Sequence, residues 1–266
     1  MPRTISLIPE QRRQQILSHL RDARVLSYRE ITELVGVSQM TARRDVATLA
    51  EEGLVRATQG GAALIERLDS EPRRAEKALI QLPQKAAIAR AAADLVEDAM
   101  MIYLDAGTTV QAIRPFLENR RNLTIVSNDL GTISAFLDHP SADLICVGGR
   151  IDRDNQSLIG RLAALTLGEL NLDLALLSSS SWDLRRGVTT PVEAKIDPKR
   201  AALRAASTSI LLADSGKYGR YAKYRVFALD ELNTVITDDA LSTDDATSMK
   251  AFGVDVVLAE ADVAAR

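Results

Sequence analysis

The hydrophobic and polar positions of the first 65 residues follow the period of short helices and then that of a hairpin. Apolar residues recur at helical spacing in three segments, residues 9–21, 27–35 and 38–52. Ser27 and Ser38 stand where the second and third segments begin, and Gly53 stands where the third ends, as helix caps do. Two strand-like runs then flank Gly60-Gly61. The pattern predicts a winged helix-turn-helix over residues 1–65.

The rest of the chain alternates apolar strands with amphipathic helices. The strand-like runs are residues 100–104, 123–127, 143–147, 172–177, 209–213, 234–237 and 254–258. Helical segments at 84–96, from Thr109 and at 129–137 separate the first of them. Such alternation predicts an α/β domain with a mostly parallel sheet over residues 84–266. Residues 66–83 are charged, poorly periodic and interrupted by prolines, so they are predicted to be a linker.

Two arginines give the third helical segment a cationic face. At about 100° per residue, Arg44 lies opposite the apolar stripe that contains Ala42, and Arg43 flanks that position. Neither arginine has an Asp or Glu three or four residues away, so the helix itself does not neutralise them. Unpaired guanidinium groups suit DNA phosphates and base edges. A solvated basic face is the alternative, and the surrounding helix-turn-helix pattern argues against it.

The charge balance narrows the class of protein. The chain has 33 Lys and Arg against 36 Asp and Glu, a net charge of -3. Residues 1–65 carry nine Arg and seven acids, so they are weakly positive (+2) and the remainder is acidic (-5). This distribution favours site-directed DNA binding over a general nucleic-acid coat. A single cysteine, Cys146, and the lack of an apolar run of about 20 residues predict a cytoplasmic protein without a membrane span.

Polar loops follow four of the predicted strands, at the sheet edge where ligands bind in such folds. These loops are residues 105–109, 127–129, 148–150 and 214–217. Gly107 permits close approach of an anion to the backbone, Thr108 and Thr109 add hydroxyl groups, and a lysine at 217 suits a phosphate. The loops predict either a site for a small, polar, anionic ligand or ordinary turns and helix caps.

The N-terminal residues resemble the DeoR family of bacterial repressors. The resemblance rests on residues 11–17, Val37-Ser38, Thr41 to Asp45, Leu49 with Gly53 to Val55, and Gly60 to Ala62. It implies double-stranded operator DNA as the partner, with the third helix in the major groove and the wing on phosphates. The implied DNA-binding residues are Ser38, Gln39, Thr41, Arg43, Arg44, Arg56, Gln59 and Gly60. Ser38 is either a phosphate contact or only a helix cap.

Residues from about Lys85 to Asp238 resemble the sensor domain of the same family. The matching pieces are 105–109, Ser127-Asn128, Gly148-Gly149, Ser157 with Gly160, Gly187 to Thr190 with Glu193, Asp214 to Lys217, and Ile236 to Asp238. Family members bind phosphorylated sugars or related intermediates in a domain similar in fold to ribose-5-phosphate isomerase. The resemblance therefore implies a phosphorylated sugar effector and no cofactor. The implied effector-binding residues are Asp105, Gly107, Thr108, Thr109, Asn128, Gly149, Arg150, Glu193, Asp214 and Lys217.

Two stretches depart from the family pattern. Ser178 to Ser181 and Trp182 stand where relatives have a glycine-containing turn, and Trp182 either covers the ligand or packs inside the fold. Asp197-Pro198 interrupts a stretch that is helical in relatives, so the helix is expected to restart at Pro198. This interruption leaves the positions of Glu193 and Lys195 open.

The resemblance implies a repressor of carbohydrate catabolism genes. It is expected to be a homodimer or homotetramer, because paired recognition helices read two half-sites. The alternative is an isomerase-type enzyme with a DNA-binding head, for which Asp105, Glu193 and Asp214 are the candidate acids and bases. The serine run occupies the region where isomerases look rich in carboxylates, and His19 and His139 lie away from the polar loops. Neither catalysis nor a transition-metal site is expected.

Overall fold

A computed structural model describes residues 7–58 and 60–261 of the chain. The chain forms two compact units, Met1–Glu66 and Arg67–Arg266. No helix among the described residues is long and apolar enough to cross a membrane.

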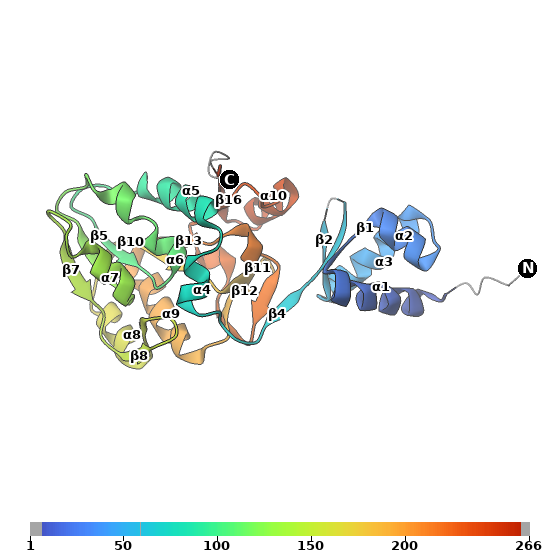
Figure 1. Cartoon of the computed structure of the whole chain (residues 1–266), viewed down its shortest axis with the longest axis horizontal. Coiled ribbons are helices and arrows are strands. Elements are labelled where there is room, and N and C mark those ends of the chain that lie inside the picture. The colour runs from blue at the N-terminus through green and yellow to red at the C-terminus, as the bar shows by residue number, and fades with distance from the viewer. Residues whose placement is uncertain (1–6, 59, 262–266) are drawn as a thin grey trace, which may run out of the picture. The chain divides into compact units, whose positions relative to one another are not determined.

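The first unit is a winged helix-turn-helix, as predicted (Figure 1). Its elements are α1 (Pro9–Ala23), β1 (Val25–Ser27), α2 (Tyr28–Val35), α3 (Gln39–Glu51), β2 (Val55–Thr58) and β3 (Gly61–Leu64). The strands form an antiparallel sheet in the order β1-β3-β2, so β1 adds a third strand to the predicted hairpin. The apolar faces of the helices and the sheet enclose a core that includes Ile16, Ile31 and Leu49.

Local signals explain where the helices of the first unit begin and end. Ser27 begins α2 with a capping box, in which its hydroxyl accepts from the Glu30 amide and the Glu30 carboxylate accepts from Ser27. Gly36 ends that helix in the left-handed conformation, at φ 65°. Ser38 Oγ accepts a hydrogen bond of 3.3 Å from the Thr41 amide and begins α3. The structure therefore shows Ser38 as a helix cap, and a phosphate contact by the same residue stays a prediction.

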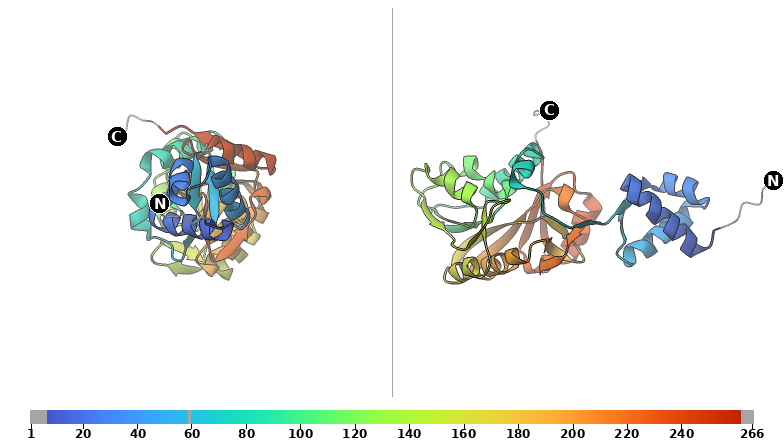
Figure 2. Two further views of the ribbon diagram at one scale, coloured as in Figure 1. Left: turned by 90° about the vertical axis from the view of Figure 1, so that its right-hand side faces the viewer. Right: turned by 60° about the horizontal axis from the view of Figure 1, so that its bottom comes forward.

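The second unit contains a parallel seven-stranded sheet with helices on both faces (Figure 2). The strand order is β17-β16-β13-β10-β5-β6-β7. The strands are β5 (Met101–Leu104), β6 (Thr124–Ser127), β7 (Asp143–Cys146), β10 (Leu172–Ser178), β13 (Ala206–Leu212), β16 (Thr234–Asp238) and β17 (Asp255–Ala259). Helices α5 (Leu82–Ala93), α6 (Thr108–Gln111) and α7 (Leu130–Phe136) pack in the hydrophobic core of one face. Helices α8 (Arg161–Gly168), α9 (Ile196–Ala205) and α10 (Thr243–Ala251) pack in that of the other.

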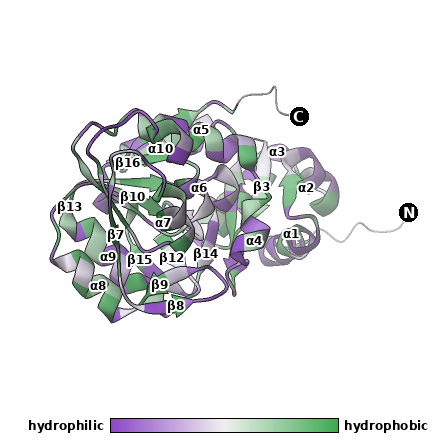
Figure 3. Ribbon diagram, turned by 60° about the vertical axis from the view of Figure 1, so that its left-hand side comes forward, coloured by the Kyte–Doolittle hydropathy of each residue, from purple (hydrophilic) through white to green (hydrophobic). Residues whose placement is uncertain are grey.

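The predicted alternation of strands and helices is confirmed, with small shifts at the strand ends. Strand β13 begins at Ala206 and β17 ends at Ala259, so each extends slightly beyond its apolar run. Hydrophobic residues are concentrated on the central strands such as β10 (Figure 3), whose residues from Leu174 to Ser178 are all buried. Central parallel strands are covered on both faces, and this is why the runs were readable from hydrophobicity alone.

Several short elements were not predicted. They are β4 (Glu66–Leu68), which pairs with β14 (Arg220–Ala222); the hairpin of β8 (Arg150–Asp152) and β9 (Ser157–Ile159); the sheet of β11 (Ser181–Asp183), β12 (Gly187–Thr190) and β15 (Tyr224–Phe227); α4 (Arg74–Ala78); and 3-10 turns at Arg114–Leu117, Glu193–Lys195, Ser215–Lys217 and Leu229–Glu231. Segments of three to five residues are too short to show a period. Residues 66–83, predicted as a linker, thus contain a strand and a helix.

The two departures from the family pattern have simple structural outcomes. Helix α9 begins at Ile196 and contains Pro198 in its first turn, where a missing amide hydrogen disrupts no helical bond. The helix therefore does not restart at Pro198. Trp182 is fully buried, with its ring centre 4.8 Å from that of Tyr218, so it packs inside the fold rather than covering a ligand.

Candidate DNA-binding surface and effector site

Helix α3 carries the predicted DNA-contacting residues on its exposed side. Gln39, Arg43 and Arg44 are exposed, while Ala42 and Val46 are buried, as the apolar pattern predicts. Arg44 forms no ion pair with any described residue. The Arg43 guanidinium lies 4.8 Å from the centre of the Tyr28 ring, a contact that orients the side chain without neutralising its charge. Two cationic groups are thus available to DNA on this face.

A buried ion pair fixes α3 on α1. Both carboxylate oxygens of Asp45 accept from Arg12, at 2.7 Å from Nε and 3.1 Å from Nη2. Asp45 is buried, and Arg12 also donates to the Leu7 carbonyl oxygen at 3.1 Å. This bidentate geometry occupies Asp45 fully, so its charge does not neutralise Arg43 or Arg44.

The wing is the hairpin of β2 and β3. Arg56 is half-buried on β2, and Gly60 is exposed at the turn, with its carbonyl oxygen accepting from the Tyr28 amide at 2.8 Å. Gln59 lies outside the described residues. A side chain on Gly61 would place its Cβ 1.9 Å from the Leu26 carbonyl oxygen, so close strand pairing requires this glycine. The DNA contacts predicted for the wing remain predictions.

Replacing Arg44 with alanine is expected to weaken operator binding by about 2 kcal/mol, roughly 30-fold, because one contact to a base edge is lost. Titration of a labelled operator duplex measures the change. Arg21→Ala, which removes an exposed arginine from α1, is the matched control. Equal affinity of the two variants would remove Arg44 from the recognition surface.

A cavity of about 280 Å³ lies in the second unit where strands of the parallel sheet end. The loops after β5, β10 and β13 form one side, and the segment from Leu68 to Lys85 forms the other. Its lining residues are Leu68, Glu71, Pro72, Lys77, Ile80, Gln81, Lys85, Ala106, Gly107, Thr108, Thr109, Ser178, Ser179, Ser180, Asp214, Gly216, Lys217 and Arg220. The size suits a small metabolite, and the position is the carboxyl edge where parallel sheets bind ligands.

Cations outnumber anions around this cavity. Lys77, Lys85, Lys217 and Arg220 line it, against Glu71 and Asp214. The pKa of Lys85 is lowered to about 8, first by burial and next by the nearby ammonium of Lys217, whose effect outweighs the opposite effect of Asp214. The Lys217 ammonium lies 3.1 Å from Asp214 Oδ2, so that acid is already paired. A bound anion would offset the effect of Lys217 on Lys85.

Two hydroxyl groups in the cavity wall lack protein partners. Thr109 Oγ1 and Ser179 Oγ are buried and form no hydrogen bond with any described residue. Buried polar atoms in proteins are nearly always hydrogen-bonded, which makes these two hydroxyl groups unusual. The wall of the cavity thus contains both ammonium groups and hydroxyl groups.

Below the cavity lies an internal polar cluster centred on Asp105. The buried Asp105 carboxylate accepts from the backbone amide and the hydroxyl of Ser178, both at 2.8 Å, and from the Lys199 ammonium. Lys199 also donates to the Ser178 carbonyl oxygen at 2.7 Å. Asn128 accepts from the Ala106 amide at 2.9 Å and donates to the Leu158 carbonyl oxygen at 3.1 Å. These contacts hold the loop after β5 against the end of β10, and they use the side chains that the sequence assigned to the ligand.

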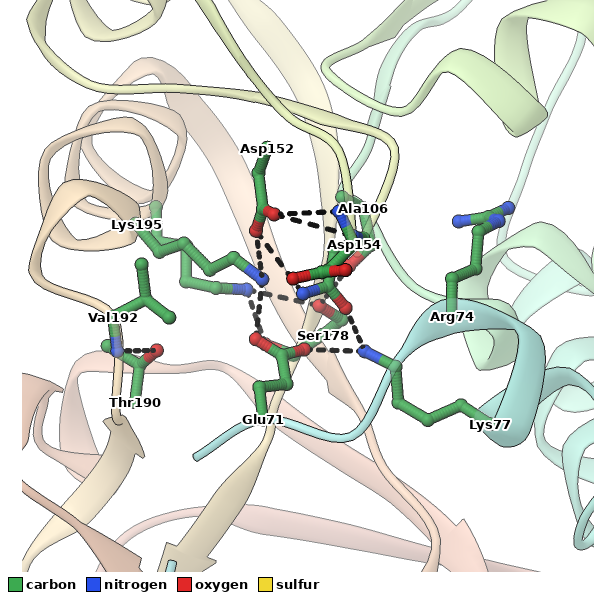
Figure 4. A network of polar contacts seen from close by, with 12 residues as sticks. Glu71, Arg74, Lys77, Ala106, Asp152, Asp154, Ser178, Thr190, Val192 and Lys195 are labelled. Atoms are coloured by element: carbon green, nitrogen blue, oxygen red, sulfur yellow. Dashed lines mark hydrogen bonds and ion pairs between the residues drawn. The ribbon is translucent and has the colours of Figure 1, made fainter. Parts of the chain in front are cut away.

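A second network ties the segment before α5 to the sensor fold (Figure 4). The Glu71 carboxylate lies between the ammonium groups of Lys77 and Lys195. Burial alone would raise the pKa of Glu71, but Lys195 and Lys77 outweigh it and hold that pKa at about 2. Lys77 also donates to Asn155 Oδ1 at 2.6 Å, and Lys195 lies 3.6 Å from Asp152. Glu71 is therefore ionised at neutral pH and anchors the segment.

The structure brings only some of the predicted effector residues to the cavity. Gly107, Thr108, Thr109, Asp214 and Lys217 line it, while Asp105 and Asn128 lie in the cluster below it. Gly149, Arg150 and Glu193 are not among the lining residues.

The positions of Gly149, Arg150 and Glu193 in the fold explain why they do not line the cavity. Gly149 and Arg150 follow β7, the edge strand, whereas the cavity lies over the ends of β5, β10 and β13. Glu193 is exposed on its 3-10 turn. Gly149 has a local reason to be glycine, because a Cβ there would lie 2.9 Å from the Ile159 carbonyl oxygen. Their contact with an effector stays a prediction.

Lys85 and Lys199 were missed as site residues, although the sequence holds a signal for each. Lys85 stands three and four residues before Ile88 and Ala89, on the buried stripe of α5. Lys199 is likewise three residues before the buried Ala202. A lysine on an apolar stripe must meet an anion or a polar cavity, so this placement could have identified both. Glu71 and Lys77 gave no comparable signal within their charged segment.

Both units match known family profiles. The DeoR C-terminal sensor domain matches residues 80–239, and the DeoR-like helix-turn-helix domain matches residues 12–68. The HTH-type transcriptional regulator YgbI of Escherichia coli K12 is 40% identical over 235 residues, which cover 88% of this chain and 92% of YgbI. The transcriptional repressor AccR of Agrobacterium fabrum is 31% identical over 237 residues, covering 88% of this chain and 91% of AccR.

A weaker likeness was found among solved structures. Ribose 5-phosphate isomerase A of Methanocaldococcus jannaschii aligns with a TM-score of 0.37 and 16% identity, over 50% of this chain and 53% of the isomerase. A likeness of this size carries no conclusion about function.

Proposed function

The chain belongs to the DeoR family of transcriptional regulators, and on this premise we propose that it represses carbohydrate catabolism genes under the control of a phosphorylated sugar. It is a DNA-binding regulator and not an enzyme, because relatives named as regulators match it over most of its length.

The effector proposal is based on the lysines that line the cavity. Lys77, Lys85 and Lys217 supply ammonium groups for a phosphate, and the pKa of Lys85 is lowered first by burial and next by the charge of Lys217. The unbonded hydroxyls of Thr109 and Ser179 provide partners for sugar hydroxyl groups. Four cations line the cavity against two acids, and therefore the phosphorylated form, rather than a neutral sugar, is the proposed effector.

The cavity wall also offers a route from effector to DNA. Lys77 and Lys85 belong to the segment that follows the first unit in the chain, and Glu71 in the same segment is held by Lys77 and Lys195. A phosphate that recruits Lys77 competes with Glu71 for this ammonium and so changes how the segment is anchored. We propose that this exchange alters operator affinity by about 1–3 kcal/mol, the usual size of allosteric coupling.

We further propose that the protein acts as a homo-oligomer, a dimer or a tetramer. A single recognition helix reads only a few base pairs, whereas two heads related by two-fold symmetry read both halves of an operator. Sedimentation equilibrium of the full chain, with and without operator, measures the state, and a monomer at the concentration that saturates the operator would contradict the proposal.

Thermal unfolding against a panel of sugar phosphates, with the free sugars as controls, tests the effector proposal. A ligand that binds the native state raises the melting temperature in proportion to the logarithm of its excess. One sugar phosphate is expected to raise it while its free sugar does not, and the same compound should release operator DNA. If every free sugar acts as strongly as its phosphate, the lysines do not read a phosphate. Absence of any shift across the panel would overturn the effector proposal.

Effector binding is expected to weaken as pH rises through about 8. Lys85 loses its proton in the free protein near that pH, and a bound phosphate favours the charged form, so binding above it requires proton uptake. Affinity should fall by up to about tenfold per pH unit above 8. Lys85→Arg, which stays charged, should bind independently of pH between about 8 and 10. A wild-type affinity that is equally flat would show that Lys85 does not face the phosphate.

A further inference from the structure

Helices α8 and α9 border an open groove on the surface of the second unit, and Figure 3 shows the two helices side by side. The volume of this groove is about 610 Å³, and none of the residues that line it lines the effector cavity. The space between the helices stays unfilled because many of the residues that face it are small: Ala164, Gly168, Ala201 and Ala205. The groove is therefore a surface feature separate from the effector site.

Helix α8 exposes two leucines at this groove. Leu162 and Leu165 are 66% and 52% exposed, and Leu165 lines the groove. Ala163 and Leu167 of the same helix are buried in the core. At about 100° per residue, Leu165 lies on the side of the helix opposite to this buried pair. A helix that is apolar on its buried side and again on its outer side indicates a further contact partner.

Four charged residues line the groove, and none of them forms an ion pair with any described residue: Arg161, Glu169, Asp197 and Arg204. Helices α8 and α9 lead into β10 and β13, which are neighbouring parallel strands, so the two helices run in the same direction. Arg161 and Asp197 therefore lie at one end of the groove. Glu169 and Arg204 lie at the other end, where the cation is on α9 instead of α8.

This arrangement of charges is complementary to itself. Across a two-fold axis that runs along the groove, Arg161 of one copy meets Asp197 of the other. Glu169 then meets Arg204, so that every charge gains an opposite partner. An axis across the groove instead pairs Arg161 with Glu169, and again no like charges meet. Two cations and two acids leave no excess charge, so the groove favours neither a nucleic acid nor a strongly charged protein.

We propose that this groove is a contact surface between two copies of the chain, with Leu165 of each copy seated in the groove of the other. The inference rests on the proposed homo-oligomer and assigns its assembly to a surface of the sensor unit. The leucines supply the apolar centre of the contact, and the surrounding charges select a second copy over other partners.

The test uses two charge-reversed variants of the full chain. Arg161→Glu/Arg204→Glu makes the four charges of the groove all acidic, and Glu169→Lys/Asp197→Lys makes them all basic. Sedimentation equilibrium at low salt measures the self-association of each variant and the association of an equimolar mixture of the two. Each variant alone presents like charges to its own copy, whereas the mixture restores opposite charges across the interface.

Matched controls separate this effect from a general loss of stability. Arg121→Glu/Lys250→Glu reverses two exposed cations that do not line the groove, and it should associate as wild type does. Thermal unfolding confirms that every variant folds. Leu165→Asp tests the apolar part of the contact, because it places a charge where the interface excludes water, and it should weaken self-association at least as much as the charge reversals.

Each charge-reversed variant is expected to self-associate at least about tenfold more weakly than wild type, and the mixture is expected to recover most of the loss. Variants that associate as tightly as wild type would overturn the inference, since the groove would then have another occupant or none. A mixture that associates no better than either variant alone would overturn it as well. If the wild-type chain is a monomer, the homo-oligomer proposal itself fails, and this inference fails with it. The effector proposal is tested separately, by ligand-induced stabilisation.

Discussion

Replacing Asp45 with alanine is expected to unfold most of the first unit and so to abolish DNA binding. Both oxygens of the buried Asp45 carboxylate bind Arg12, and the variant leaves that guanidinium inside without its partner. Removing the acid from this pair, in which Asp45 is buried and Arg12 partly buried, costs up to about 3 kcal/mol. A unit of this size buries a small core and has little stability to lose. The effect therefore exceeds that of removing an arginine that touches DNA.

Circular dichroism during heating and an operator titration measure the two consequences together. Asp22→Ala, an exposed aspartate on α1, is the matched control and should behave as wild type. The double variant Arg12→Met/Asp45→Leu should regain most of the stability, because an apolar pair of similar volume replaces both charges. If Asp45→Ala melts like the control yet fails to bind DNA, then Asp45 acts on DNA and not through the fold.

The first unit could be predicted closely because its signals are local. Ser27 with Glu30, Gly36 and Ser38 each act within three or four residues, and each appears in the structure as the cap that its type predicts. What the sequence could not show is the pair of Arg12 and Asp45, whose partners are 33 residues apart. Such a contact depends on how two helices pack, which no single-helix pattern records.

The parallel sheet was predictable for a different reason. Its strands are buried on both faces and read as apolar runs, as in β10. The short strands β8, β11 and β14 have no such run, because each is only three residues long. They were consequently missed.

The effector site was predicted in part, and the division has a physical basis. Loops that follow neighbouring strands meet at one edge, which correctly brought Thr109 and Lys217 to the same cavity. The strand order was needed to show that Arg150 lies outside the cavity, because β7, which precedes it, is the edge strand. The other wall comes from residues 68–85, which were read as a linker because their charges gave no period. Only the fold reveals that Glu71 pairs with Lys195, 124 residues away.

Replacing Lys217 with alanine is expected to remove the response of DNA binding to the effector while leaving binding without effector unchanged. A charge-assisted contact to a phosphate in a mostly buried cavity is lost, at a cost of about 3 kcal/mol or roughly 150-fold in affinity. Asp214 also loses the ammonium that lies 3.1 Å from its carboxylate, and the buried negative charge that remains then repels the phosphate. Both effects lower the affinity for the phosphorylated effector.

Operator release as a function of effector concentration measures this change, with the sugar phosphate that raises the melting temperature as the ligand. Lys250→Ala, an exposed lysine on α10, should release DNA at wild-type concentrations. Adding Asp214→Asn to Lys217→Ala should recover part of the affinity, because the repelling carboxylate is gone while the lost contact is not restored. Release by Lys217→Ala at wild-type concentrations would show that the phosphate binds elsewhere in the cavity, with Lys77 and Lys85 as the remaining ammonium groups.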